Sequence, residues 1–134
     1  MDAEVKRWCD LVRTVSYEAH RFLRHGHLEK IYENSLANRL RALNVEVKQQ
    51  FPVPVYDEDG TLLGDFFADL LVENWLIIEL KACRALCDEH SAQLLGYLCA
   101  SRMEHGILIN FGAPKLQIKK LIFNPRDTTL NSET

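Results

Sequence analysis

The sequence has no apolar run long enough to cross a bilayer, and its start, MDAEVKRWCD, lacks the layout of a signal peptide. It also has no internal repeat, no low-complexity tract and no interdomain linker. For a chain of 134 residues, these absences predict one domain with a single hydrophobic core. We expect a cytoplasmic protein that does not act at a membrane.

An excess of basic residues is also missing. The chain has 16 Lys and Arg against 19 Asp and Glu, a formal net charge of −3. Many nucleic-acid-binding domains are strongly basic, so this balance argues against tight, indiscriminate DNA binding. It leaves room for a local basic patch, and a site that holds a divalent cation would offset part of its own acidity.

Cysteine is scarce, with four residues at positions 9, 83, 87 and 99. In a cytosolic protein we expect reduced, mostly buried thiols rather than a disulfide framework. Cys83, Cys87 and His90 form a candidate zinc group, but their spacing fits no familiar zinc motif and no second pair completes four ligands. A Cys/His hydrolase is disfavoured because none of these side chains lies in a strand-to-helix elbow beside a base.

The apolar pattern predicts helices and strands in a mixed order. Helical spacing covers residues 2–24 and 28–43, and Glu29 and Glu33 extend the apolar stripe of the second helix at its N-terminal end. We expect the other elements to be strands at 46–57, 66–72, 75–80, 105–111 and 116–123 and a helix at 86–102. Because Pro52 and Pro54 cannot donate to a sheet, the first strand is expected at an edge. This order predicts an α/β fold in which helices cover a mixed sheet.

Charged residues interrupt the two central apolar strands. Asp69 lies inside the run 66–72, and Glu79 and Lys81 follow at the end of the run 75–80. Charged side chains are rarely buried unless they are paired or bind a metal. Alternate residues share a face, so Asp69 and Glu79 meet only if an odd turn such as ENW pairs residue 69 with residue 79. A two-residue turn would place them on opposite faces.

In the odd register, two carboxylates repel each other, and the pKa of each rises unless a cation neutralises them. Mg²⁺ or Mn²⁺ is the expected occupant, because hard divalent ions prefer oxygen ligands. Such an ion can provide a nucleophilic water and polarise a phosphate, and Lys81 would orient the water or stabilise the phosphate charge. A structural ion pair between Lys81 and one of the carboxylates is the simpler alternative.

These motifs resemble a known family. DFFADLLV and WLIIELK resemble the D-x(n)-E-x-K signature of the PD-(D/E)XK nuclease superfamily, and GHLEKIY resembles the signature of its small GxxExxY proteins, with Gly26, Glu29 and Tyr32 at the defined positions. FPVPVY, EHSAQLLGYL and GILINFG extend the resemblance over about residues 11–123. One departure is RHGHLE, where the family often has a second glycine.

The resemblance implies a restriction-endonuclease-like, three-layer α/β core with an extra N-terminal helix. It implies one nuclease-like domain at 1–123, and the polar segment 124–134 is expected to be a flexible tail. Asp69, Glu79 and Lys81 would form the catalytic core, with both carboxylates binding Mg²⁺ or Mn²⁺. Glu29 would be a third catalytic and metal-binding carboxylate. Glu33 is its rival, with a solvated glutamate as the plainer alternative.

Gln93 and Tyr97 resemble the Gln-x-x-x-Tyr element that contacts substrate in one nuclease branch. They lie four residues apart on one predicted helix face, as that role requires. Taken alone, Gln93 would be a partly buried amide and Tyr97 a core aromatic. We expect His90 and Tyr32 to have structural roles, a hydrogen-bonded histidine and a packed tyrosine.

We therefore predict a divalent-metal-dependent nuclease that hydrolyses phosphodiester bonds, with DNA favoured over RNA as the partner. The alternative is a non-catalytic nucleic-acid-binding or protein-interaction module that retains the nuclease fold. It arises because the sequence shows no separate DNA-reading domain, zinc ribbon or ATPase motif. The exposed face of the N-terminal helix is a candidate homodimer surface.

Overall fold

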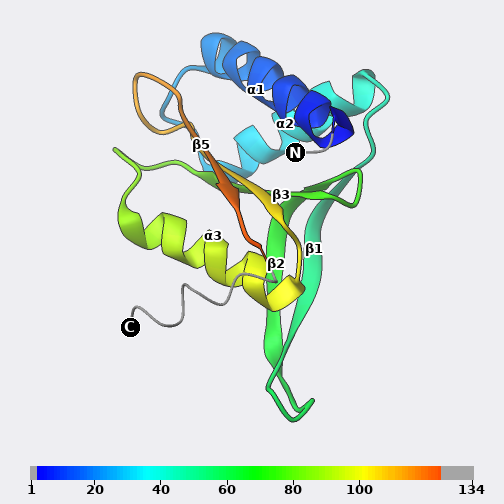
Figure 1. The fold of residues 1–134 in the computed structure, drawn as a ribbon. Coiled ribbons are helices and arrows are strands. Elements are labelled where there is room, and N and C mark those ends of the chain that lie inside the picture. The colour runs from blue at the N-terminus through cyan, green and yellow to red at the C-terminus, as the bar shows by residue number, and fades with distance from the viewer. Residues whose placement is uncertain (1–2, 125–134) are drawn as a thin grey trace.

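The computed structural model describes residues 3–124 and shows the predicted α/β architecture (Figure 1). Its elements, in chain order, are α1 (Ala3–Leu23), α2 (Glu29–Ala42), β1 (Val47–Tyr56), β2 (Leu62–Val72), β3 (Leu76–Lys81), α3 (Asp88–Ser101), β4 (His105–Asn110) and β5 (Gln117–Ile122). The predicted tail at 124–134 lies, beyond Asn124, outside the described residues.

The sheet is mixed, as predicted. Its strand order is β1-β2-β3-β4-β5, and only β3 and β4 are parallel neighbours. β1, with its two prolines, lies at an edge, which confirms that prediction. β2 begins at Leu62 rather than at residue 66, so β1 and β2 form a long hairpin that projects from the sheet (Figure 1). Residues 62–65 are exposed, which explains why no buried apolar run revealed them.

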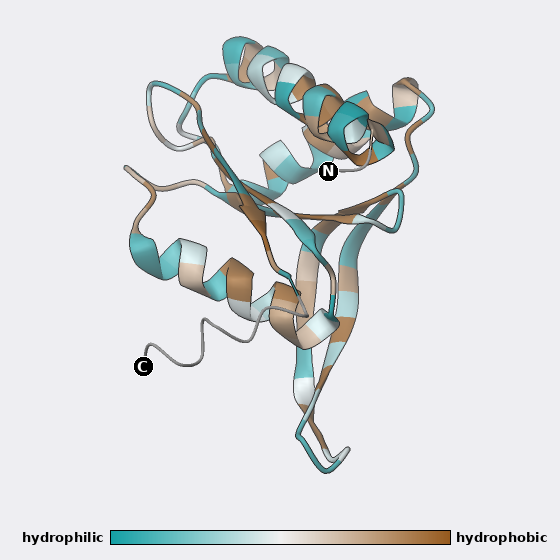
Figure 2. Ribbon diagram, in the orientation of Figure 1, coloured by the Kyte–Doolittle hydropathy of each residue, from teal (hydrophilic) through white to brown (hydrophobic). Residues whose placement is uncertain are grey.

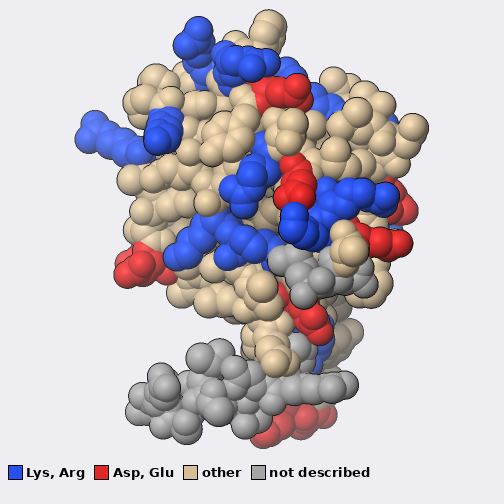
Figure 3. All heavy atoms as spheres, turned by 45° about the horizontal axis from the view of Figure 1, so that its top comes forward, with Lys and Arg blue, Asp and Glu red and all other residues tan. Residues whose placement is uncertain are grey.

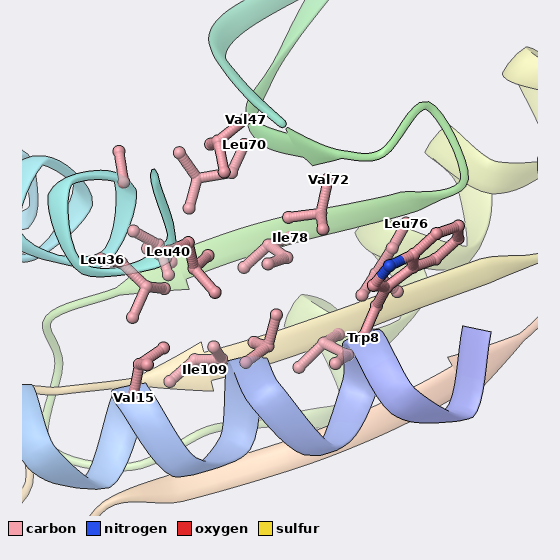
Figure 4. Packing of buried hydrophobic residues seen from close by; sticks show 14 of the residues in the cluster. Trp8, Val15, Leu36, Leu40, Val47, Leu70, Val72, Leu76, Ile78 and Ile109 are labelled. Carbon is pink, nitrogen blue, oxygen red and sulfur yellow. The ribbon is translucent and has the colours of Figure 1, made fainter. Parts of the chain in front are cut away.

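α1 and α2 cover one face of the sheet. Their apolar sides are turned toward the strands and their polar sides face outward (Figure 2). Trp8, Val15, Leu36 and Leu40 are buried against strand residues such as Ile78 (Figure 4). This cluster is the larger part of the core, and it holds the N-terminal end of α2 beside the strands that carry the charged residues.

α3 covers the opposite face. Leu94 and Leu98 are fully buried and pack with Ile77 and Leu108 of the central strands. Gly106 in β4 permits this close approach, because a Cβ atom there would lie 3.1 Å from a methyl carbon of Leu94. The sheet is therefore apolar on both faces, as expected for a layer between helices.

All four cysteines are free thiols, as predicted. The expectation that they would be mostly buried is wrong, because only Cys9 is buried. Cys87 lies at the N-terminal cap of α3 and Cys99 on its exposed side. Over residues 3–124, no helix is long and apolar enough to span a membrane.

Candidate active site

The turn between β2 and β3 sets the register that the charged residues require. The ladder pairs Leu70 with Ile78 and Val72 with Leu76, leaving the three residues 73–75 as the turn. Continued by one step, it places residue 69 opposite residue 79. Of the two registers that the sequence left open, the structure has the odd one, so both carboxylates lie on the same side of the sheet.

Asp69 and Glu79 lie where β2 and β3 stop pairing through their backbones. An Asp69 carboxylate oxygen accepts a hydrogen bond of 2.8 Å from the Leu80 backbone N–H. A Glu79 carboxylate oxygen accepts one of 3.3 Å from the Asp69 backbone N–H. Side-chain oxygens thus replace the carbonyl groups of a regular ladder, and this holds the two carboxylates beside each other.

Both carboxylates are held in a poorly solvated place. Burial, followed by the charge of Asp69, raises the pKa of Glu79 to about 8. Burial also raises the pKa of Asp69, although the Leu80 N–H, Gln50 and Lys81 act in the opposite direction. The deprotonated pair is therefore unfavourable without a counter-charge, which is the electrostatic condition for a cation site.

Glu33 is a buried supporting residue. Its side chain is 4% exposed, so the solvated alternative is wrong. One carboxylate oxygen accepts a 2.7 Å hydrogen bond from Gln50, and the other accepts bonds from Gln49 at 2.7 Å and from Lys30 at 2.9 Å. With its oxygens occupied in this way, Glu33 serves to hold the neighbouring amides.

Glu29 faces the same site with its oxygens available. It is exposed at the first position of α2 and makes no hydrogen bond through its carboxylate to the described part of the chain. Burial and then the charge of Asp69 raise its pKa, while the charge of Lys81 lowers it. These influences show that Glu29, Asp69 and Lys81 share one electrostatic environment.

Gln50 links the supporting glutamate to the site, a connection that the sequence did not reveal. It stands opposite Asp69, between the pairs Gln49–Leu70 and Phe51–Ala68. Its amide nitrogen donates to Asp69 at 3.1 Å and to Glu33 at 2.7 Å. Its φ of 50° is rare for a residue other than glycine, and such strain tends to collect at functional sites. Two adjacent glutamines in a strand were the only sequence signal.

Lys81 ends β3 on the same strand face as Glu79. Its ammonium donates to the side-chain oxygen of Gln93 at 3.2 Å. Among the described residues no ion pair joins Lys81 to a carboxylate, so the simpler structural-pair interpretation is not observed. Its positive charge still acts against the rise in the pKa of Asp69 and of Glu79, without cancelling it.

Gln93 and Tyr97 lie on the side of α3 that faces the site. Gln93 is exposed and contacts Lys81, which is not the partly buried amide of the plainer alternative. Tyr97 stacks on Phe66, with ring centroids 3.8 Å apart. Burial, then the charges of Glu79 and Asp69, raises the pKa of Tyr97, so its hydroxyl lies within their influence.

His90 and Tyr32 have structural contacts, as predicted. His90 accepts a 3.2 Å hydrogen bond from the Cys87 backbone N–H and so caps α3. Tyr32 is fully buried, stacks on Phe111 at 4.6 Å, and donates its hydroxyl to the carbonyl oxygen of Arg24. Among residues 3–124, no three His, Cys, Asp or Glu side chains are arranged around one metal position. This applies to Cys83, Cys87 and His90, the candidate zinc group, and equally to the expected trio of Glu29, Asp69 and Glu79.

Comparisons with known proteins agree with this architecture. Of the solved structures, four chains match, among them the crystal structure of SSO0001, with a TM-score of 0.55 and 21% identity. That match covers 75% of this chain and 52% of the other, so the chain spans about half the length of that protein, and the likeness shows the fold alone. No curated protein gives a significant match. The family model of the PD-(D/E)XK nuclease superfamily matches residues 6–121, and the chain therefore belongs to this superfamily.

Proposed function

We propose that the protein is a Mg²⁺- or Mn²⁺-dependent nuclease that hydrolyses phosphodiester bonds, with DNA favoured over RNA. The observation that carries the proposal is the Asp69–Glu79 pair, in which each carboxylate accepts a hydrogen bond from the backbone of the other strand. Burial and the neighbouring Asp69 charge raise the pKa of Glu79 to about 8. A stable fold does not need two repelling carboxylates in a poorly solvated place. A nuclease does need them, because they hold a metal ion against a phosphate.

The residues present fit a hard divalent ion. Asp69 and Glu79 supply carboxylate oxygens, and their mutual repulsion would be relieved by a cation. Mg²⁺ characteristically takes one or two carboxylates and keeps several waters, so a site with two direct protein ligands suits it. When bound, such an ion supplies an activated water and neutralises charge on the phosphate.

The remaining side chains have separate tasks. Lys81, held by an amide rather than by a carboxylate, keeps its charge available to a phosphate oxygen or to the attacking water. Glu29 keeps its oxygens available for a water molecule beside the ion. Gln93 positions Lys81, and Tyr97 would contact the substrate strand from α3. The narrower assignment to the GxxExxY proteins rests on Gly26, Glu29 and Tyr32.

Two isosteric variants test the proposal. Asp69→Asn and Glu79→Gln remove one charge each and keep the side-chain size, so the fold should survive. We expect wild-type protein to cut single- or double-stranded DNA with Mg²⁺ or Mn²⁺. Both variants should cut at least about 100-fold more slowly. RNA of the same sequence, assayed in parallel, decides the substrate class.

Calorimetry with the metal alone separates the nuclease from the non-catalytic alternative. The nuclease proposal expects a Mg²⁺ or Mn²⁺ site in wild-type protein that disappears in Asp69→Ala. A protein that binds nucleic acid equally well in a chelator, cuts nothing and takes up no metal would be the non-catalytic module.

A further inference from the structure

A basic pocket lies between the C-terminal end of α1 and the loop that joins β4 to β5. It has a volume of about 430 Å³ and is lined by His20, Arg21, Arg24, His25 and Pro114. Four of these five residues carry a basic side chain. In a chain with a net charge of −3, this is a local reversal of charge.

The pocket walls are fixed by hydrogen bonds that do not use the guanidinium groups of the two arginines. The ring of His20 bonds the carbonyl oxygen of Ala113 at 3.0 Å, which joins α1 to the β4–β5 loop. The backbone N–H of Arg24 donates to the His20 carbonyl oxygen at 2.8 Å. The Arg24 carbonyl oxygen accepts the Tyr32 hydroxyl. A pocket built in advance loses little conformational entropy when a ligand enters.

The arginine charges are available to a ligand. Arg21 and Arg24 are exposed, and neither forms an ion pair with a carboxylate among residues 3–124. Figure 3 shows that Lys and Arg side chains cover more of the face carrying α1 than Asp and Glu do. The planar guanidinium group matches phosphate oxygens in two-point hydrogen bonding, so the preferred ligand is a phosphate group.

The β4–β5 loop, which forms one wall of the pocket, leaves the sheet at the same edge as β3, because Lys81 pairs with Asn110 at the ends of the two parallel strands. On one wall, His25 precedes Glu29 by four residues, which span at most about 14 Å. On the other wall, the β4–β5 loop begins at Phe111, whose N–H bonds the Lys81 carbonyl oxygen at 2.9 Å. Phosphates of one strand follow at about 3.4 Å along a duplex axis, so the two places are a few nucleotides apart.

We propose that this pocket binds a backbone phosphate of the nucleic-acid strand, a few nucleotides from the bond that is cut. The inference rests on the proposed nuclease function for the identity of the strand. The two arginines would neutralise the flanking phosphate and fix the strand's register over Asp69 and Glu79. A small acidic protein thereby gains local affinity for a polyanion.

The test compares two charge-matched double variants. Arg21→Gln/Arg24→Gln empties the pocket of its arginine charge, and Arg7→Gln/Arg13→Gln removes the same charge from exposed positions of α1 outside it. DNA binding is measured by fluorescence anisotropy in EDTA, over a range of salt concentrations. For the pocket variant only, we expect about tenfold weaker DNA binding. We also expect the slope of log K against log[salt] to correspond to about 1 to 2 fewer counterions released on binding. Equal effects of the two variants, or no effect of either, would overturn the inference.

A second measurement separates a strand phosphate from free phosphate. NMR signals of the His20 and His25 rings should shift with a short oligonucleotide at far lower concentration than with inorganic phosphate. Equal potency of inorganic phosphate would identify a free-phosphate site and reject the strand. If wild-type protein cuts DNA and the pocket variant binds and cuts equally well, only this inference fails. If wild-type protein cuts nothing, yet the pocket variant alone loses binding, the inference stands and the nuclease proposal fails.

Discussion

Asp69 and Glu79 are residues that a protein core normally excludes, and the sheet nevertheless holds them together. Each accepts a hydrogen bond from a backbone N–H group of the neighbouring strand, and Asp69 accepts a further one from the Gln50 side chain, so the fold sets their position. Their charges are not offset by an ion pair with Lys81. The site is thus built at a cost to stability, which is a common feature of functional sites.

One consequence is a pH dependence of stability in metal-free protein. The pKa of Glu79 rises from 4.5 to about 8 on folding, so the folded protein holds this proton more tightly than the unfolded chain does. The contribution of Glu79 to the free energy of unfolding is therefore fully present below about pH 4.5 and is lost as the pH rises through 8. We expect Glu79→Gln to gain stability relative to wild type between pH 5 and pH 8.5, by on the order of a few kcal/mol. Urea unfolding in EDTA measures the difference. Glu58→Gln, which makes the same change at an exposed position, is the control. Parallel curves for wild type and Glu79→Gln would show that Glu79 ionises freely.

Gln50 gives a second prediction at this scale. Gln50→Asn keeps an amide and tolerates a positive φ, but is too short to reach both Asp69 and Glu33. We expect a 10- to 100-fold loss of metal affinity or of cleavage rate, as for other residues that orient metal ligands, with a melting temperature near that of wild type. Gln49→Asn is the control, since Gln49 contacts Glu33 but not Asp69. An unchanged Gln50→Asn protein would mean that Asp69 is held without it.

The sequence revealed charged residues more readily than amides. Asp69, Glu79 and Lys81 stood out because a charge inside an apolar strand needs an explanation. Gln50 did not, because an amide in an edge strand is ordinary and its positive φ has no sequence signature. Glu33 was visible as a candidate, but its burial depends on the side-chain amides of Gln49 and Gln50 in β1. These two residues follow Glu33 in the sequence by 16 and 17 positions.

At the scale of elements, the turn after β2 carries the arrangement of the site. Glu73 and Asn74 have φ values of 52° and 60°, and the Trp75 N–H bonds the Val72 carbonyl oxygen at 3.0 Å. Positive φ at both central positions is the mark of a type I′ hairpin turn. Trp75 is then the extra residue that makes the loop odd and brings residue 69 opposite residue 79.

This geometry predicts a stabilising substitution. Glu73 is strained at positive φ, and asparagine adopts that conformation more easily. We expect Glu73→Asn to raise the free energy of unfolding by about 0.5–1 kcal/mol and to leave cleavage unchanged. Glu58→Asn makes the same chemical change in the β1–β2 turn, where φ is not positive, and should bring no such gain. A destabilised Glu73→Asn protein would indicate that the bond from the Glu46 N–H to the Glu73 side chain outweighs the strain.

Element types were predictable because helices and buried strands have distinct apolar periods. The residues at which elements begin and end were less predictable. Leu62, Gly64 and Asp65 at the start of β2 pair with β1 while remaining exposed. α3 begins at Asp88, after a cap made by Cys87 and His90. Such boundaries depend on strand pairing and on capping by local side chains, which a hydrophobic pattern does not record.

At the scale of the whole molecule, two helical layers enclose a sheet whose β3 end carries the site. α2 brings Glu29 and Glu33 to it from one face, and α3 brings Gln93 and Tyr97 from the other. The order of elements in the sequence predicted this layering. It did not predict the basic pocket, because its arginines approach Pro114 only when α1 lies against the β4–β5 loop.

Metal binding should therefore be visible as global stability. An ion that binds only the folded protein adds about 2.7 kcal/mol at a concentration 100 times its Kd. We expect Mn²⁺ to raise the melting temperature of wild-type protein by several degrees and to have no effect on Asp69→Asn. Differential scanning calorimetry with and without the ion measures this. An equal rise in both proteins would place the ion elsewhere.

The most direct measurement is DNA cleavage by wild-type protein and by Lys81→Ala, each with Mn²⁺ and each also assayed for DNA binding in EDTA. Lys119→Ala, which removes a more exposed lysine, serves as the matched control. The account predicts that wild type and Lys119→Ala cut DNA, while Lys81→Ala binds it and does not cut. Undiminished cleavage by Lys81→Ala, or no cleavage by any of the three proteins, would contradict it.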